Sequence, residues 1–578
     1  MGFAPLRVHQ AQKLKTSSTK EEAKMRSNLN KDILAGAILV ALLGIAGCGS
    51  PSSTVVSTGP PPPTTVTVTP ATATLLRGAK QQFVAQVTGP SDKTVTWSVD
   101  ATFGSIDSNG LYTAPTDSGG GSVSVTATSK ATPGARATAT VTFPDVVFAI
   151  APNTIALTPG ASHTFNATVT GLPSTQVVWT VQGTSGGTIT STGVYTAPST
   201  KGIYHVRATY SANANYSAAA DVLVTATPSS FTPTGNLVDA RYFHTATLLS
   251  NGKVLVAGGA TFEAYCFAGI SSAEVYDPAP GSFALTAPMT DRRYAQTATL
   301  LQNGKVLMSG GFSFDSTSCL LDGASPALTS AELYDPSSGS FAPTGSLTEA
   351  RGIHTATLLA SGKVLIAGGG KTGGNGLPLG GTGSATAEIY EPGTGVFTST
   401  GNMTTARMGQ TATLLLNGKV LIAGGLTSSS TNPVATAELY DPMTGKFALT
   451  GSMSVGRAGH AATLLQNGKV LIAGGLTAGL KSSSSAEVYD PATDSFLATG
   501  SMAFARVTDT ASLLPDGTVL VVGGGSSISE IYDRSTGSFS PSALAEFDRS
   551  GHSATLLQNG SVIVIGGFGS STTAELYP

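Results

Sequence analysis

Short runs of alternating apolar and polar residues fill most of this 578-residue chain, and turn residues separate them. Runs such as FVAQVTG and VTWSV place every second side chain on one face, which is the pattern of a half-buried β-strand. Gly, Pro, Asn and Asp stand between the runs, where they favour tight turns. The pattern predicts an all-β protein built from many short antiparallel strands.

Composition supports this prediction and excludes several other classes of protein. The chain has 70 Gly, 31 Pro and two Trp, a composition typical of short strands joined by tight turns. Only 11% of the residues are charged and the formal net charge is −2, so no nucleic-acid partner is expected. With 40% hydrophobic residues, the chain is also unlike a charge-driven disordered protein.

The longest apolar run, residues 33–47, lies near the N-terminus and ends directly before Cys48. It is shorter than the roughly 20 residues of a membrane-spanning helix, and we interpret residues 1–47 as a signal peptide. Met25 would give this peptide a conventional short n-region, which favours Met25 over Met1 as the start. The run ends in IAGC, which resembles the lipobox of bacterial lipoproteins and implies that Cys48 is acylated and anchors the chain in a lipid bilayer. An ordinary signal peptide or a signal anchor is the alternative.

The segment 48–65 follows without the alternation of a strand. It is rich in Ser, Thr and Pro, and its proline run at 60–63 favours an extended polyproline conformation. We interpret this segment as a tether. Because a signal peptide precedes it, we expect the chain in the bacterial cell envelope, either in the periplasm or exposed on the surface.

Two copies of an internal repeat follow the tether, about 82 residues apart. Phe83 and Trp97 of the first copy correspond to Phe165 and Trp179 of the second, and GSIDSNGLYTAP corresponds to GTITSTGVYTAP. We interpret both Trp side chains as core residues rather than sugar-stacking residues, because a Trp repeated at one position buries a large area. The copies, at 66–143 and 146–226, resemble bacterial Ig-like domains of the BIG2 type, which implies two β-sandwiches that act as spacers or adhesive modules.

A second repeat fills residues 229–578, with seven copies and a mean spacing of about 50 residues. Each copy opens on an Arg, continues through two strands joined by a turn such as Asn-Gly, and contains a Gly pair. A Glu two residues before a Tyr marks its second half. The Arg residues are Arg241, Arg293, Arg351, Arg407, Arg457, Arg506 and Arg549. The Glu residues are Glu274, Glu332, Glu388, Glu438, Glu487, Glu530 and Glu575.

The two ends of this region complement each other. The last copy stops at AELYP without a fourth strand, whereas SSFTPTG at 229–235 is an additional strand before the first Arg. The repeats resemble Kelch repeats, including propellers of the galactose-oxidase central-domain kind. We therefore predict two Ig-like β-sandwiches followed by a seven-bladed β-propeller closed by an N-terminal strand.

The repeated charged residues have a structural interpretation. Catalysis does not need seven copies of one Arg and one Glu, so we expect a recurring ion pair or backbone-bracing contact in each blade. Three residues after each Arg, the copies have His, Gln or Asp, which indicates a hydrogen-bonding position rather than a metal site. In chain order these residues are His244, Gln296, His354, Gln410, His460, Asp509 and His552.

The resemblance to galactose oxidase raises copper–radical oxidation as an alternative activity. That family uses two Tyr, two His and a Tyr crosslinked to Cys, with one ligand from a further C-terminal domain. This chain shows no residue-by-residue match to that set, so no copper ligand, other metal, cofactor or catalytic residue is assigned.

The best functional clue is the gap between the Gly pair and the Glu of each copy. The gaps of the first three copies, at 260–272, 312–330 and 370–386, are longer than those of the sixth and seventh copies. Binding variation in repeat proteins gathers on such loops, and these gaps carry aromatic residues that are candidate anchors for a partner or a sugar. Packing of the loops against each other is the alternative role. The aromatic residues are Phe262, Tyr265, Phe267, Phe312 and Phe314.

These observations favour a non-catalytic cell-envelope protein that binds or acts as a scaffold. Its expected partner is an envelope or extracellular protein or a polysaccharide. A carbohydrate-active or galactose-oxidase-like enzyme with a site in the propeller mouth is the second hypothesis. A structural surface component is the third.

Cys266 and Cys319 lie in the gaps of adjacent copies, and in an oxidising compartment we predict a disulfide between them. Thiol titration of the denatured, unreduced mature protein should then detect no free cysteine, since Cys48 carries lipid. Two free thiols per chain would reject the disulfide.

Overall fold

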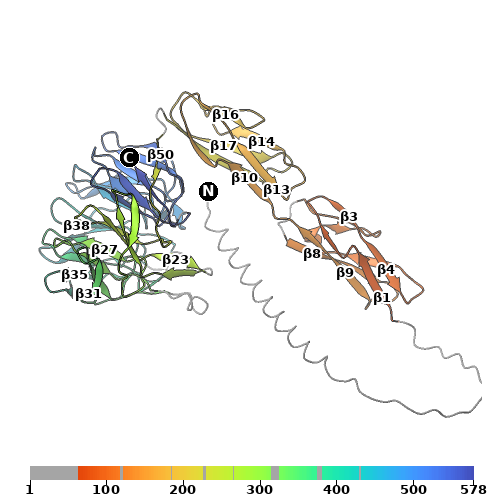
Figure 1. Ribbon diagram of the computed structural model, residues 1–578, viewed down its shortest axis with the longest axis horizontal. Helices are drawn as coiled ribbons and strands as arrows, with labels where there is room; N and C mark the ends of the chain where they lie inside the picture. The colour runs from red at the N-terminus through yellow and green to blue at the C-terminus, as the bar shows by residue number, and fades with distance from the viewer. Residues whose placement is uncertain are drawn as a thin grey trace, which may run out of the picture. The chain divides into compact units, whose positions relative to one another are not determined.

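The computed structural model describes residues 63–116, 121–183, 185–225, 229–263, 266–313, 325–373, 381–427, 431–569 and 571–578 (Figure 1). Apart from one short 3-10 helix, η1 (Ala101–Phe103), all regular elements in these residues are β-strands. This confirms the predicted all-β fold class. These residues form two compact units. The first contains the described residues up to 155, with 160–198 and 204–222, and the second contains 156–159, 199–203 and the described residues from 223 onward.

The first repeat folds as two β-sandwiches of the same topology. Each has a four-stranded sheet, a three-stranded sheet and a two-stranded pair, in the orders β2-β9-β8-β5, β3-β7-β6 and β1-β4 for the first copy. The second copy has the orders β11-β18-β17-β14, β12-β16-β15 and β10-β13. The first copy comprises β1 (Thr65–Thr69), β2 (Thr72–Thr74), β3 (Lys80–Gln82), β4 (Val84–Thr88), β5 (Val95–Ser98), β6 (Ser105–Ile106), β7 (Leu111–Thr113), β8 (Gly121–Ser129) and β9 (Arg136–Phe143). The second comprises β10 (Val147–Ala151), β11 (Thr154–Leu157), β12 (Ser162–Thr164), β13 (Asn166–Thr170), β14 (Val177–Val181), β15 (Thr188–Ile189), β16 (Val194–Thr196), β17 (Gly202–Tyr210) and β18 (Ser217–Val224).

The centre of the first sandwich is aromatic. Phe83 and Tyr112 are fully buried with their rings edge to face, and Trp97 packs partly buried against this cluster. The Trp97 ring covers Gly110, where a Cβ would lie 2.9 Å from the ring and where φ is +84°. Only glycine accommodates both the ring and this backbone conformation.

In the described residues of the second unit, seven sheets form the propeller, each with four antiparallel strands, and the sheet of blade 6 has a short fifth strand that pairs parallel at its edge. Their innermost strands contact each other in chain order, and the innermost strand of blade 7 contacts that of blade 1. Blade 1 comprises β21 (Thr245–Leu248), β22 (Val254–Ala257), β25 (Ala273–Asp277) and β26 (Ser282–Leu285), and blade 2 comprises β27 (Thr297–Leu300), β28 (Val306–Ser309), β30 (Ala331–Asp335) and β31 (Ser340–Pro343). Blade 3 comprises β32 (Thr355–Leu358), β33 (Val364–Ala367), β35 (Ala387–Glu391) and β36 (Val396–Ser399), and blade 4 comprises β37 (Thr411–Leu414), β38 (Val420–Ala423), β39 (Ala437–Asp441) and β40 (Lys446–Leu449). Blades 5 to 7 comprise β41 (Ala461–Leu464), β42 (Val470–Ala473), β45 (Ala486–Asp490) and β46 (Ser495–Ala498); β47 (Thr510–Leu513), β48 (Val519–Val522), β49 (Ile528–Asp533) and β50 (Ser538–Leu544); and β51 (Ser553–Leu556), β52 (Val562–Ile565), β53 (Ala574–Tyr577) and β20 (Thr232–Pro233).

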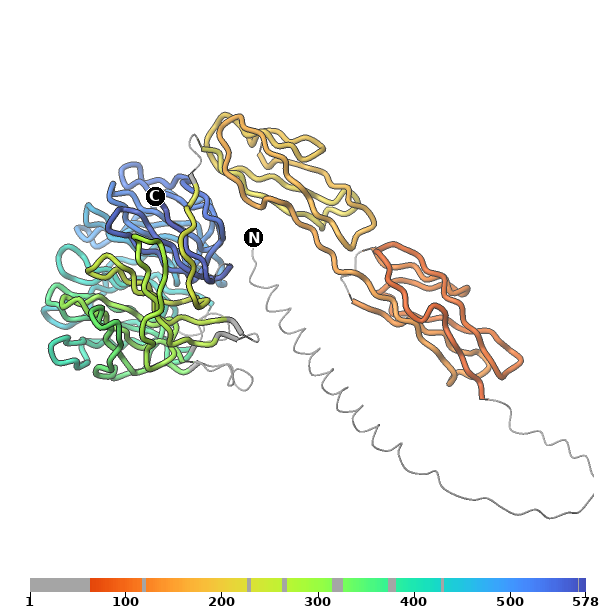
Figure 2. Tube along the Cα trace, viewed as in Figure 1, coloured from red at the N-terminus to blue at the C-terminus, as the bar shows by residue number. Residues whose placement is uncertain are grey.

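The N-terminal strand supplies the fourth strand of blade 7. β20 pairs antiparallel with β53, and the preceding β19 (Ser229–Ser230) pairs parallel with β50 of blade 6. Figure 2 shows the yellow-green start of the propeller running beside the blue C-terminal blades. Phe231 is buried between these blades, with its ring centroid 5.4 Å from that of Tyr577. The first and last segments of the propeller are therefore joined by strand pairing and by packing.

A buried Tyr connects each of blades 1 to 6 to the segment before it. In blade 1, the Tyr276 ring packs against Phe283 with a centroid distance of 4.8 Å, and its hydroxyl bonds Thr234 Oγ1 at 2.9 Å. Because Thr234 directly follows β20, this bond ties blade 1 to blade 7. In blade 3, Tyr390 bonds Thr344 of blade 2 in the same way, at 3.0 Å.

A ring of backbone hydrogen bonds also links the blades. The residue two positions after each repeat Arg has a φ between 46° and 65°, in the left-handed region. Its N–H donates to the carbonyl of the corresponding residue in the preceding blade, at 2.8 to 3.3 Å. The ring closes where the N–H of Phe243 in blade 1 donates to the carbonyl of Gly551 in blade 7. At one seam the N–H of Gly551 donates instead to Thr508 Oγ1, at 3.2 Å. The residues are Phe243, Ala295, Ile353, Gly409, Gly459, Thr508 and Gly551.

Candidate functional site

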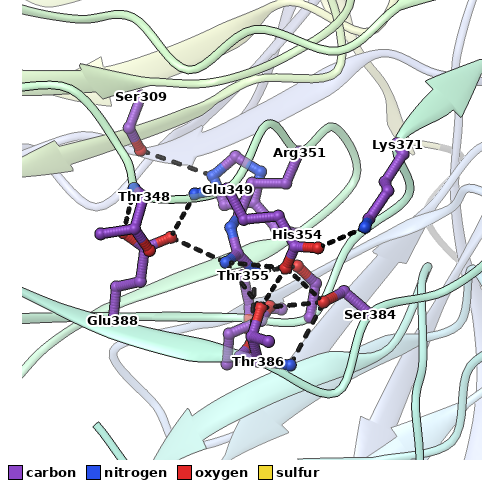
Figure 3. Close-up of polar contacts among 12 residues, drawn as sticks. Ser309, Thr348, Glu349, Arg351, His354, Thr355, Lys371, Ser384, Thr386 and Glu388 are labelled. Carbon is purple, nitrogen blue, oxygen red and sulfur yellow. Dashed lines mark hydrogen bonds and ion pairs between the residues drawn. The ribbon is translucent and has the colours of Figure 1, made fainter. Parts of the chain in front are cut away.

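The repeat Arg lies at the centre of a buried polar cluster, shown for blade 3 in Figure 3. Arg351 Nη1 donates to the carbonyls of Gly368 and Thr386 at 2.6 and 3.2 Å, and Nη2 donates to Glu388 Oε1 at 2.7 Å. Glu388 also accepts a hydrogen bond from the N–H of Thr348, at 2.5 Å. The pair therefore joins the segment before β32 to both ends of the gap loop.

All seven blades contain this pair. Each Arg is at most 1% exposed and each Glu at most 2%. The Nη2–Oε1 distances are 2.6 Å for Arg241–Glu274, 2.9 Å for Arg293–Glu332, 2.7 Å for Arg351–Glu388, 2.7 Å for Arg407–Glu438, 3.1 Å for Arg457–Glu487 and 2.9 Å for Arg506–Glu530, and Arg549 pairs with Glu575. These side chains are buried and bonded to each other, so they are not accessible to a substrate.

Blades 1 to 3 carry an additional acid two residues before the Arg, which the sequence analysis did not identify. These acids are Asp239, Asp291 and Glu349. Glu349 lies 2.8 Å from Lys371 Nζ and accepts hydrogen bonds from Ser384 and Thr386. Burial alone would raise the pKa of Glu349, but these hydrogen bonds and the Arg351 charge lower it to about 2. The same three blades have the long gaps. An acid two residues before the repeat Arg, present only in these blades, is therefore the sequence feature that could have revealed this contact.

Blades 6 and 7 have aromatic residues at the position of these acids. The guanidinium carbon of Arg506 lies 5.7 Å from the centroid of the Phe504 ring, and that of Arg549 lies 5.6 Å from the centroid of Phe547. At this distance the ring face attracts the cation. The repeat Arg therefore has an acid beside it in blades 1 to 3 and an aromatic ring beside it in blades 6 and 7.

The His and Gln residues that follow the Arg bond the preceding blade. His354 of blade 3 lies 2.9 Å from Thr297 Oγ1 of blade 2, and His244 of blade 1 lies 2.8 Å from Ser553 Oγ of blade 7. Gln296 donates to the carbonyl of Ala257 at 2.8 Å. Burial lowers the pKa of His354 to about 3, so this imidazole is neutral at physiological pH. Within the described residues, no group of three or more His, Cys, Asp or Glu is placed to hold a metal ion.

The structure corrects the interpretation of Phe312 as a binding anchor. Its side chain is fully buried in a cluster with Tyr242, Ala260 and Tyr294, with a ring-centroid distance of 5.6 Å to Tyr294. Phe312 follows the Gly pair of blade 2 directly, and its backbone pairs with that of Tyr294, which turns the side chain inward. The other candidate side chains lie outside the described part of the chain, namely Phe262, Tyr265, Phe267, Phe314 and the three cysteines Cys48, Cys266 and Cys319.

Backbone hydrogen bonds connect the gap loops of blades 2 to 5 into one layer, which we call the loop rim. β29 (Ser325–Pro326) of blade 2 pairs antiparallel with β34 (Thr372–Gly373) of blade 3. The N–H of Gly383 in blade 3 donates to Thr427 of blade 4 at 2.9 Å, and that of Gly479 in blade 5 donates to Thr431 of blade 4 at 2.9 Å. The gap loop of blade 1 forms its own hairpin, β23 (Ala260–Glu263) with β24 (Cys266–Gly269).

Comparison with known families supports the resemblance drawn from the repeats. Residues 62–139 match the family model of the bacterial Ig-like domain (group 2), and residues 407–454 and 457–502 each match the model of the Kelch motif. The chain carries a bacterial Ig-like domain and Kelch repeats. These domains indicate a binding or scaffold role. A search of curated protein sequences finds no match.

A search of solved structures finds partial matches to this chain, among them a copper oxidase. A fungal alcohol oxidase of the AA5 family, solved in complex with copper, has 16% sequence identity to this chain and a TM-score of 0.48. The match covers 61% of this chain and 77% of the oxidase. At this level of similarity, the match says nothing about the activity of this chain.

No helix within the described residues is long and apolar enough to cross a bilayer.

Replacing Arg351 with Ala should destabilise the propeller, because Glu388 would remain buried without its cation. We expect the free energy of unfolding to fall by about 3–5 kcal/mol, measured by denaturant or thermal unfolding. Lys371→Ala is the matched control, since Lys371 is 63% exposed and its ion pair with Glu349 should contribute no more than about 1 kcal/mol. Unchanged melting of R351A would reject the structural role of the pair.

Proposed function

We propose that this chain is a non-catalytic cell-envelope protein whose Kelch propeller binds a protein or a polysaccharide through the loop rim. The observation that carries the proposal is the connected backbone of the gap loops in blades 2 to 5. Loops tied to each other lose less conformational freedom when a partner binds, because part of the ordering cost is met during folding. A preorganised loop surface on a rigid scaffold is typical of binding sites.

The placement of the chemically active side chains also favours binding over catalysis. The repeat Arg and Glu residues are buried in pairs, and the four repeat His residues bond hydroxyl groups of the neighbouring blades. Groups used in this way are not available as acid, base or nucleophile for a substrate. Sequence variation is concentrated instead in the gap loops, which differ from blade to blade while the strands repeat.

The rim can be tested with the full mature chain immobilised as bait. We expect the wild type to capture an envelope protein or a polysaccharide, and a variant whose gaps 312–330 and 370–386 are shortened to the length of the blade 7 gap to lose this capture. Met443→Ser is the matched control, because Met443 is 97% exposed in the turn between the third and fourth strands of blade 4, away from the gap loops. Melting temperatures should show that both variants are folded.

Retained capture by the shortened variant would show that recognition does not use the rim. If neither protein captures anything and the wild type oxidises or cleaves sugars, the enzyme hypothesis replaces this proposal. Full activity of the shortened chain in an assay of surface integrity would favour a structural component.

The proposal also places the chain in the bacterial envelope, anchored through lipid on Cys48, with the segment 48–65 and the Ig-like domains as tether and spacers. Cys48→Ala should therefore remove labelled fatty acid from the protein and move it from the membrane fraction to the soluble fraction. Cys266→Ala is the control and should keep both the label and the membrane location. Membrane association without label in C48A would indicate a signal anchor instead.

A further inference from the structure

One seam of the propeller lacks the side-chain hydrogen bond that the other six have. In six blades, the His or Gln three residues after the Arg bonds a hydroxyl or a carbonyl of the preceding blade. Blade 6 has Asp509 at this position. Among the described residues, neither carboxylate oxygen of Asp509 has a hydrogen-bond partner, and the residue is only 8% exposed.

The Asp509 carboxylate occupies the position that the His imidazole or the Gln amide occupies in the other six blades. A Cβ at the first Gly of the preceding blade's Gly pair would lie 2.5 Å from Nε2 of Gln296, 2.8 Å from Cε1 of His354 and 3.0 Å from Oδ1 of Asp509. The side chain is therefore directed into the seam between blades 5 and 6, as its counterparts are at their own seams.

The opposing blade also lacks the usual donor. His354, His460 and His552 bond Thr297, Thr411 and Thr510, each the first residue of the innermost strand in the preceding blade. In blade 5 this residue is Ala461, which is buried and has no hydroxyl group. The other acceptors of such head groups are carbonyls, as in Gln410 with Ala367, and a carbonyl cannot donate to a carboxylate. The Thr463 hydroxyl of blade 5 also lies at this seam, but it donates to the carbonyl of Ala511 at 3.0 Å and not to Asp509. The position that faces Asp509 therefore presents no donor to its carboxylate.

Charged neighbours do not remove this imbalance. The charges that act on Asp509 are Arg506 and Glu530 of its own blade and Arg457 of blade 5. Each Arg is already bonded to its repeat Glu, at 2.9 Å for Arg506–Glu530 and 3.1 Å for Arg457–Glu487. The two guanidinium groups also make the seam unfavourable for a metal cation. A proton on the carboxylate removes the charge and supplies the missing donor.

We propose that Asp509 is a proton-binding site in the seam between blades 5 and 6, and that loss of this proton in alkaline medium weakens the seam. The neutral acid can act as the Gln amides of blades 2 and 4 do, by donating into the seam. The ionised carboxylate is buried without a donor, which is costly. This inference is independent of the partner that the rim binds.

The direction of the pH dependence follows from burial. Burial raises the pKa of Asp509 from its ordinary value of 3.8 to about 7, against the smaller lowering effects of Arg506, of its own backbone N–H and of Arg457. The unfolded chain therefore releases this proton at a lower pH than the folded chain. The stability that the group contributes is complete below about pH 4, falls as the pH rises to about 7, and is absent above that.

Asp509→Asn tests the site, because the amide has the size of the acid, cannot ionise and can donate. The melting temperature of the full mature chain is measured between about pH 5 and pH 8.5. Across this range we expect the melting temperature of the wild type to fall by a few degrees relative to that of D509N, which lacks the titrating group. Difference infrared spectra of the two proteins at the acidic end should show a protonated-carboxyl stretch in the wild type only.

Asp533→Asn is the matched control in the same blade. Asp533 is a turn residue whose pKa is lowered by hydrogen bonds from Ser535, so it stays ionised throughout this range and its replacement should leave the pH dependence unchanged. If D509N does not fold, Ala461→Thr carries the test, since it restores the hydroxyl present in other blades and should reduce the alkaline loss.

Results of two kinds would overturn the inference. One is an equal pH dependence in wild type and D509N, or an undiminished alkaline loss in A461T. The other is a rise in the melting temperature of the wild type, but not of D509N, when calcium or sodium chloride is added at alkaline pH, because a bound cation would then replace the proton.

Discussion

A buried arginine bonded to a buried glutamate organises every blade of this propeller. Removing both charges from water is costly, and the cost is met only because each guanidinium also bonds backbone carbonyls and each carboxylate accepts backbone N–H groups. In blade 3 these bonds fix the ends of the gap loop at Gly368 and Thr386 and the entry to the innermost strand at Thr348. The pair therefore specifies where each loop leaves the scaffold, whatever the loop contains.

This local constraint explains how the propeller combines a uniform scaffold with variable loops. The blades are joined to each other by contacts that do not involve the gap loops, such as Tyr390 with Thr344, His354 with Thr297, and the ring of backbone hydrogen bonds. Loops of different length can then be carried by blades that pack alike. In blades 1 to 3, which have the longest gaps, Asp239, Asp291 and Glu349 add contacts to the Arg, and Glu349 and Asp291 also bond the loop ends.

Much of the fold and part of the site could be predicted from the sequence. The alternation of apolar and polar residues, the turn residues and the repeat marks predict the strands, the sandwiches and the completion of the last blade. The prediction for Phe312 was wrong because its burial depends on Tyr294 and Tyr242, residues of two different blades that meet only after folding. The left-handed conformation of Phe243, Ala295, Ile353 and Thr508 was likewise invisible, because these residue types rarely adopt it without tertiary support.

The sequence by itself determined the features that depend on local pattern. These are the β-class, the two repeats, the position of one Arg and one Glu in each blade, and the apolar run that ends at Cys48. Only the tertiary structure decided which groups face each other across a seam: His354 meets Thr297, whereas Asp509 meets a seam in which blade 5 has Ala461. The physical reason is that hydrogen bonding and desolvation depend on neighbours from another blade, so identical repeat positions acquire different properties when the chain folds.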